Sequence, residues 1–143
     1  MPDSHDDRFD LQRFVSAQAS VYNQVTAELA AGAKTSHWMW FVFPQLKVLG
    51  RSGTARHYGI ASLAEAQAYA EHLLLGARLR QCGGLLLAVQ GRSALQIFGS
   101  IDALKLRSCL TLFERAAPHE PLWGQLLDKF YAGERDPATL QWL

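Results

Sequence analysis

The residues best suited to chemistry gather just before an aromatic run, Trp38–Phe43. His37 stands there beside Lys34 and Ser36. A histidine titrates near neutral pH, so it can donate or accept a proton, and a lysine ammonium can stabilise developing negative charge. His37 is therefore the candidate catalytic acid or base. The alternative is structural: Ser36 caps a helix and His37 bonds the backbone.

A second polar cluster lies in the segment 100–116, whose apolar residues surround most of its helical surface. Asp102 and Lys105 are three residues apart, so they are neighbours on a helix. Burying an aspartate and a lysine costs free energy unless they are paired or used. A surface ion pair and a ligand contact both stay open. The basic segment 47–57 either receives an anion or is simply solvated.

Other catalytic and metal-binding patterns are missing from the sequence. The five histidines are far apart, no HExxH pair occurs, and neither cysteine has a CxxC partner. There is no Gly-x-Ser-x-Gly elbow, P-loop or dinucleotide fingerprint. We therefore expect no metal and no cofactor. Whether the protein is an enzyme stays open.

Composition and charge narrow the class of protein. The 143 residues are 49% hydrophobic and 19% charged, which fits one domain with a generous core. A net charge of +1 disfavours nucleic acid or an acidic membrane as the partner. No apolar run approaches the roughly 20 residues that a membrane span needs. An acidic N-terminus and two cysteines in apolar surroundings predict a cytoplasmic protein with reduced, buried thiols.

Helical patterns along the chain predict an all-α fold. We expect a disordered tail over residues 1–9 and a single helical domain over 10–143, built as a bundle of about six to eight mostly short helices around Trp38–Phe43. Aromatic residues and valine favour a strand in that core segment. Ser36 before it and Pro44 after it favour a short buried helix, which we adopt.

Three helix starts are marked by capping residues. The caps are Ser62 (with Glu65 three residues later), Ser93, and Asp136 (before Pro137). Gly99 is expected to end the turn that begins at Ser93. Gly83 and Gly84 fall inside another predicted helix, where each costs about 1 kcal/mol relative to alanine. We therefore expect close packing at this pair.

Four short motifs give the chain a family resemblance. They are Lys34-x-Ser36-His37-Trp38-x-Trp40-Phe41-x-Phe43-Pro44-Gln45, Leu49-Gly50-x-Ser52, Tyr58-x-Ile60 and Asp102-x-x-Lys105-Leu106-x-Ser108-x-x-Thr111-Leu112-Phe113. Over roughly Phe9 to the C-terminus the chain resembles domain-of-unknown-function family 1810, a mostly bacterial group. The resemblance implies a mainly α-helical fold and no particular activity. Members are sometimes labelled calpastatin, a label that does not suit this chain because calpain inhibition belongs to disordered repeats of low apolar content.

The first and last motifs combine polar residues with core residues, and packing alone does not require lysine, histidine, glutamine and aspartate. We predict that they meet across one cleft, which binds a small polar or anionic ligand such as a nucleotide-like metabolite. The predicted ligand-binding residues are Lys34, Ser36, Trp38, Trp40, Gln45, Tyr58, Asp102, Lys105 and Ser108. The alternative is a non-catalytic protein–protein interaction module that uses the aromatic segment 38–45. A small-molecule ligand and a protein partner both stay open.

Overall fold

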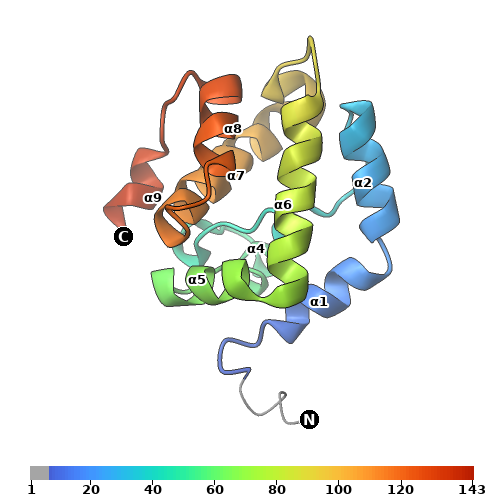
Figure 1. Ribbon diagram of the computed structural model, residues 1–143. Coiled ribbons are helices and arrows are strands. Elements are labelled where there is room, and N and C mark those ends of the chain that lie inside the picture. Colours follow the sequence, from blue (N-terminus) through green and yellow to red (C-terminus); the bar gives the residue numbers. More distant parts are fainter. Residues whose placement is uncertain (1–6) are drawn as a thin grey trace.

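The computed structural model describes residues 7–143, and these residues confirm the all-α prediction (Figure 1). They form nine α-helices and, apart from an isolated bridge between Leu46 and Ile60, no β-structure. The helices are α1 (Gln12–Ala19), α2 (Tyr22–Ala31), α3 (Met39–Val42), α4 (Gly53–His57), α5 (Leu63–Glu71), α6 (Leu73–Ala88), α7 (Ala94–Ala116), α8 (Leu122–Tyr131) and α9 (Pro137–Gln141), and a 3₁₀ turn, η2, covers Lys47–Leu49. They slightly outnumber the expected six to eight because the N-terminal stretch divides in two and the basic segment forms α4.

The predicted tail, residues 1–9, is placed only in part. Residues 1–6 lie outside the described part of the chain. The Asp7 carboxylate accepts hydrogen bonds from the amides of Leu11 (2.6 Å) and Gln12 (2.9 Å), and Phe9 packs against the core. Residues 7–9 thus belong to the folded part, because Asp7 satisfies backbone donors at the start of α1.

Two long helices organise the packing. Helix α7 contacts α5, α8 and α9, whereas α6 contacts α2, α5 and α8. Figure 1 shows α6 in front, with α5 crossing near its foot and α7 passing behind. The side chains of α7 from Ala103 onward are mostly buried, as its apolar pattern predicts. On the same helix, Ile101 and Leu104 are 69% and 64% exposed, because they lie beside a cavity rather than under a neighbouring helix.

The aromatic run forms part of the core, as expected. Met39–Val42 is a single helical turn that packs on α1, and Trp38 and Phe43 at its ends are each 1% exposed. The cap predicted at Ser36 is wrong: α3 follows Trp38 and has no side-chain cap. The Ser36 hydroxyl donates to a buried carboxylate instead.

Helix α7 is bent where Gly99 was expected to end a turn. Ser93 begins the helix with a capping box that includes Gln96, and Gly99 has φ +82° and ψ 169°, which a non-glycine residue rarely adopts. Beside this bend the backbone amide of Lys34 donates to the carbonyl of Ile97 (2.9 Å). The segment before α3 is therefore fastened to α7 by its backbone.

Close packing at the glycine pair of α6 is confirmed for one of the two positions. A Cβ atom on Gly83 would lie 2.8 Å from a terminal carbon of Leu122, and Leu126 and Trp123 are close behind. Nothing stands within 4 Å of a Cβ on Gly84. Helix α8 thus approaches α6 at Gly83, and Gly84 faces open space.

Candidate functional site

The first and last motifs do lie side by side. The Lys34 ammonium is 2.8 Å from a carboxylate oxygen of Asp102, and it also lies 5.0 Å from the ring centre of Trp38. The Lys34 side chain is only 7% exposed. Because each charge neutralises the other, this pair joins the segment before α3 to α7 and leaves neither residue available to a ligand without breaking the bridge.

Two of the predicted ligand residues bind a carboxylate that the sequence did not single out. Glu28, on α2, is 5% exposed and accepts hydrogen bonds from Ser36 Oγ (2.5 Å), from Trp38 Nε1 (2.9 Å) and from two backbone amides, of Thr35 and Ser36. A further bond comes from Gln24. Ser36 and Trp38 therefore fix the loop on α2. In the sequence, the only sign of these contacts is that an acidic residue, Glu28, lies on the preceding helix eight and ten residues before Ser36 and Trp38.

The pKa of Glu28 follows from the same contacts. Burial raises it, but the hydrogen bonds from Ser36, Gln24, the Thr35 amide and Trp38 outweigh burial and hold the pKa well below its usual range. Glu28 is thus charged near neutral pH, and its carboxylate anchors the loop to α2 through four hydrogen bonds from Thr35, Ser36 and Trp38. It has no proton to exchange near neutral pH.

Ser108 fastens the last helix. Its hydroxyl lies 2.8 Å from Asp136 Oδ2, which also accepts from the backbone and hydroxyl of Thr139 and so caps α9 as predicted. The same hydroxyl lies 3.2 Å from the carbonyl of Leu104. Ser108 therefore joins α7 to α9, although it also lines the cavity described next.

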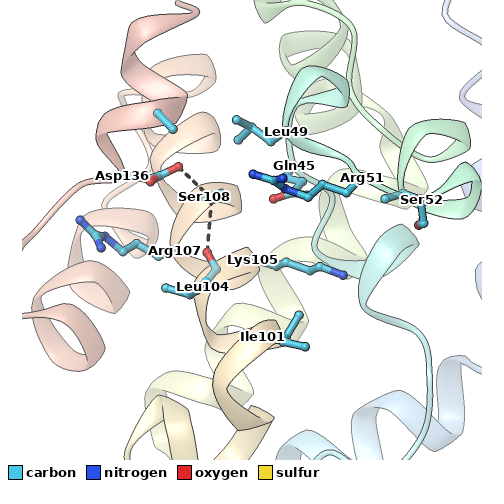
Figure 2. Close-up of a pocket in the computed structure, with 12 residues that line it drawn as sticks. Gln45, Leu49, Arg51, Ser52, Ile101, Leu104, Lys105, Arg107, Ser108 and Asp136 are labelled. Carbon is cyan, nitrogen blue, oxygen red and sulfur yellow. Dashed lines mark hydrogen bonds between the residues drawn. The ribbon is translucent and has the colours of Figure 1, made fainter.

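A cavity of about 600 Å³ opens between α7 and the segment 45–55 (Figure 2). Small-molecule sites commonly measure about 300–1,000 Å³. One wall comes from residues 45–55, the other from α7 and the start of α9. The lining residues are Gln45, Leu49, Arg51, Ser52, Ala55, Ile101, Leu104, Lys105, Arg107, Ser108, Asp136 and Ala138.

The cavity has cations on both of its walls. Figure 2 shows Arg51 extending from the 45–55 wall towards α7, and Lys105 extending from α7 towards the opposite wall. Neither forms an ion pair within residues 7–143. Arg107 is turned away, because its guanidinium donates to the carbonyls of Glu134 and Arg135. Arg51 and Lys105 are thus the positive groups left to a ligand.

A second, much smaller cavity adjoins the first. Its volume is about 10 Å³, and Trp40 and Tyr58 are among its lining residues. Gln45 and Lys105 line both cavities, and the Lys105 ammonium lies 5.6 Å from the ring centre of Trp40. Trp40 and Tyr58 thus line the small cavity and not the larger one, whereas Lys105 lines both.

His37 stands apart from these groups. It is exposed, lines neither cavity, and makes no side-chain hydrogen bond within the described residues. The structure therefore brings Gln45, Lys105 and Ser108 to the cavity and leaves His37 outside it. An acid–base role for His37 stays a prediction.

The chain is similar to known proteins over nearly its whole length. A family model described as "Protein of unknown function (DUF1810)" matches residues 8–143. The chain belongs to this family. A comparison with curated proteins finds no match.

A solved structure of a similar chain supports the fold of this DUF1810 protein. It is described as the conserved hypothetical protein Rv1873 from Mycobacterium tuberculosis. The two chains are 56% identical, and the match covers 96% of this chain and 98% of that one with a TM-score of 0.95. The all-α architecture is thus shared by a second chain of closely similar sequence.

Arg51, Ile101 and Leu104 line the cavity of the DUF1810 protein, although they are not among the predicted ligand-binding residues. Arg51 belongs to the basic segment that was considered for an anion, but nothing in its spacing placed it opposite α7. Ile101 and Leu104 belong to the segment 100–116, whose apolar residues on most sides predict a buried helix. The available signal was their three-residue spacing, which sets both on one helical face away from the buried residues.

The described residues of the DUF1810 protein contain no cluster of histidine, cysteine, aspartate and glutamate that could hold a metal ion. Among the same residues, no helix combines the length and apolar character of a membrane span. Cys82 and Cys109 are buried free thiols, as expected. Burial raises the pKa of Cys82 to about 11 and that of Cys109 well above its usual value, so neither is a reactive thiolate at neutral pH.

Proposed function

We propose that this protein binds a small anionic metabolite in the cavity between α7 and the segment 45–55. The observation that supports the proposal is the pair Arg51 and Lys105, which reach the cavity from its two walls without a carboxylate partner among residues 7–143. Nearby cations are already occupied: Lys34 binds Asp102, and Arg107 binds backbone carbonyls. An anion in the cavity would pair with the two cations that remain.

The surroundings of Lys105 strengthen its attraction for an anion. Its side chain is half-buried beside Trp40, so water screens its charge less than on an open surface. Gln45 adds an amide group that makes no side-chain hydrogen bond within the described residues. A carboxylate or phosphate would therefore meet two charged donors and one neutral donor.

A nucleotide-like ligand is one form of this proposal. Its phosphate would suit Arg51 and Lys105. Its base would stack on Trp40 or Tyr58 only if side chains moved, because both rings line the small neighbouring cavity, whose volume is about 10 Å³. The cavity therefore supports an anionic group on the ligand more strongly than it supports an aromatic ring that stacks.

The protein–protein alternative has less support. Trp38 and Phe43 are buried, while Trp40 and Phe41 are half-buried, so the segment 38–45 presents little aromatic surface to a partner. Catalysis stays an open question. The binding proposal assigns no role to His37, which lies outside the cavity lining.

The test is a thermal-shift screen of the purified protein against phosphorylated metabolites, nucleotides and carboxylic acids. A ligand at 100 times its dissociation constant should stabilise the protein by about 2.7 kcal/mol. Arg51→Ala and Lys105→Ala should remove the shift with little loss of stability. Arg56→Ala is the matched control, because Arg56 is an exposed cation of the basic segment 47–57 and does not line the cavity.

Three results would decide the matter. A shift that survives both cavity variants would overturn this site. A shift that His37→Ala abolishes would favour the role predicted for that residue instead. The absence of any shift, together with a partner captured through the segment 38–45, would favour the interaction module.

A further inference from the structure

We propose that the anion bound in this cavity carries an aliphatic body, as an alkyl or acyl chain ending in a carboxylate or phosphate does. The inference rests on the proposed function and names the ligand class for the same cavity. It follows from the side chains that line the space around the two cations.

The apolar side chains of the lining are aliphatic. They are Leu49, Ala55, Ile101, Leu104 and Ala138. Ile101 and Leu104 are more than half exposed although they share one face of α7 within a concave surface. A single exposed leucine is ordinary, but neighbouring exposed aliphatic groups in a hollow indicate a binding surface. An alkyl chain lying on them would remove this apolar area from water.

The cavity is poorly equipped for a nucleobase. No aromatic residue is among its lining side chains, so a flat ring would have nothing to stack on. The polar groups that a base edge requires are mostly engaged: Ser52 accepts from the amide of Ala55, and Ser108 is bonded to Asp136. Among these neutral side chains, Gln45 alone makes no side-chain hydrogen bond within residues 7–143, and Ser52 keeps its hydroxyl donor. An aliphatic chain needs neither stacking nor hydrogen bonds.

The charges also set the direction in which such a ligand lies. Arg51 extends from the 45–55 wall and Lys105 extends towards that wall from α7, whereas Asp136 lies at the start of α9 (Figure 2). An anionic head would be attracted to the two cations and repelled by Asp136. The aliphatic body then extends along α7 over Ile101 and Leu104.

The experiment measures binding of butanoate, hexanoate and octanoate to the full chain by isothermal titration calorimetry. Transfer of one methylene from water is worth about 0.8 kcal/mol, which corresponds to about a fourfold change in the dissociation constant. We expect each added methylene to tighten binding about two- to fourfold. A comparison of the dissociation constants of octyl phosphate and octanoate then shows whether the site prefers a phosphate or a carboxylate head.

Matched variants distinguish the contribution of the anionic head to binding from that of the aliphatic body. Leu104→Ser should flatten the dependence on chain length and leave butanoate binding nearly unchanged. Leu95→Ser is the control, because Leu95 lies on the same helix at 60% exposed, close to the 64% of Leu104, and does not line the cavity. Arg51→Ala should weaken every member of the series by about the same factor.

The possible failures are distinguishable. If nucleotides bind in an Arg51-dependent manner and octanoate binds no better than butanoate, the aliphatic inference is wrong and the proposed function stands. If Leu95→Ser lowers octanoate affinity as much as Leu104→Ser, the chain binds elsewhere and the inference is again wrong. If no anion depends on Arg51 or Lys105, both proposals fail.

Discussion

The Lys34 ammonium lies 2.8 Å from Asp102 Oδ2, three residues after the bend that Gly99 makes in α7. The backbone amide of Lys34 bonds the carbonyl of Ile97 on the other side of the same bend. One residue thus joins the segment before α3 to both parts of α7. This double attachment brings the two motifs together and fixes one end of the wall on which Lys105 stands.

Breaking the ion pair should destabilise the fold. Lys34→Met or Asp102→Asn would each leave a largely buried charge without its partner, at a cost of about 2–4 kcal/mol in the free energy of unfolding. The double variant should lose less than the sum of the two, because it leaves no unpaired charge. Urea denaturation of the four proteins measures the coupling.

Lys105→Ala is the control for the ion pair, because Lys105 has no ion-pair partner within residues 7–143. Loss of its contact with the Trp40 ring should cost less than about 1 kcal/mol. Strictly additive effects of Lys34→Met and Asp102→Asn would mean that the two side chains do not interact in solution.

Glu28 should make the stability of the protein depend on acid pH. Its pKa in the folded state is lowered from the ordinary glutamate value, so its contribution is complete above about pH 4.3 and is lost as the pH falls towards the lowered value. Glu28→Gln places an amide donor against the donors of Ser36 and Trp38, and should cost at least about 2 kcal/mol at neutral pH.

The measurement for Glu28 is the difference in free energy of unfolding between wild type and Glu28→Gln, followed from pH 7 to pH 3. The difference should shrink below about pH 4.3, because there the carboxylate takes up a proton in the unfolded chain, whereas its lowered pKa keeps it charged in the folded protein. Glu114 also has a lowered pKa, through its bonds to Arg135, but it is present in both proteins and cancels. A difference that stays constant across this range would contradict the account.

The two adjacent glycines of α6 should respond differently to substitution by alanine. Each substitution gains about 1 kcal/mol of helix propensity. At Gly83 the new methyl group would press on Leu122, and repacking costs about 1–3 kcal/mol. Gly84→Ala should therefore raise the melting temperature, and Gly83→Ala should leave it unchanged or lower it. Equal shifts in the two variants would show that α8 does not approach α6 at Gly83.

Both thiols should be protected in the native protein. Burial raises the pKa of Cys82 to about 11 and that of Cys109 well above its usual value, and both side chains are at most 1% exposed. We expect DTNB to modify neither thiol at pH 8 until the chain unfolds, and both thiols in urea. Rapid release of one equivalent of chromophore from native protein would contradict this expectation.

Much of the fold could be predicted from local signals. The caps at Ser93 and Asp136 and the bend at Gly99 depend on hydrogen bonds and dihedral preferences within a few residues, and each is found where the sequence indicated. The close contact at Gly83 was also foreseen, since glycine is costly inside a helix without a packing reason. The caps and the bend are local, so predicting them does not require knowledge of the tertiary arrangement, whereas the sequence did not show which of Gly83 and Gly84 meets a neighbouring helix.

The sequence by itself determined that the chain is helical, that Trp38–Phe43 belongs to the core, and that its two richest motifs had polar residues beyond the needs of packing. The tertiary structure decided what those residues do. Ser36 and Trp38 are structural because α2 brings Glu28 to them, and Lys105 has no ion-pair partner within residues 7–143, where Asp102 is taken by Lys34. Hydrogen bonds and ion pairs depend on distances of a few ångströms, and only the packed helices set those distances.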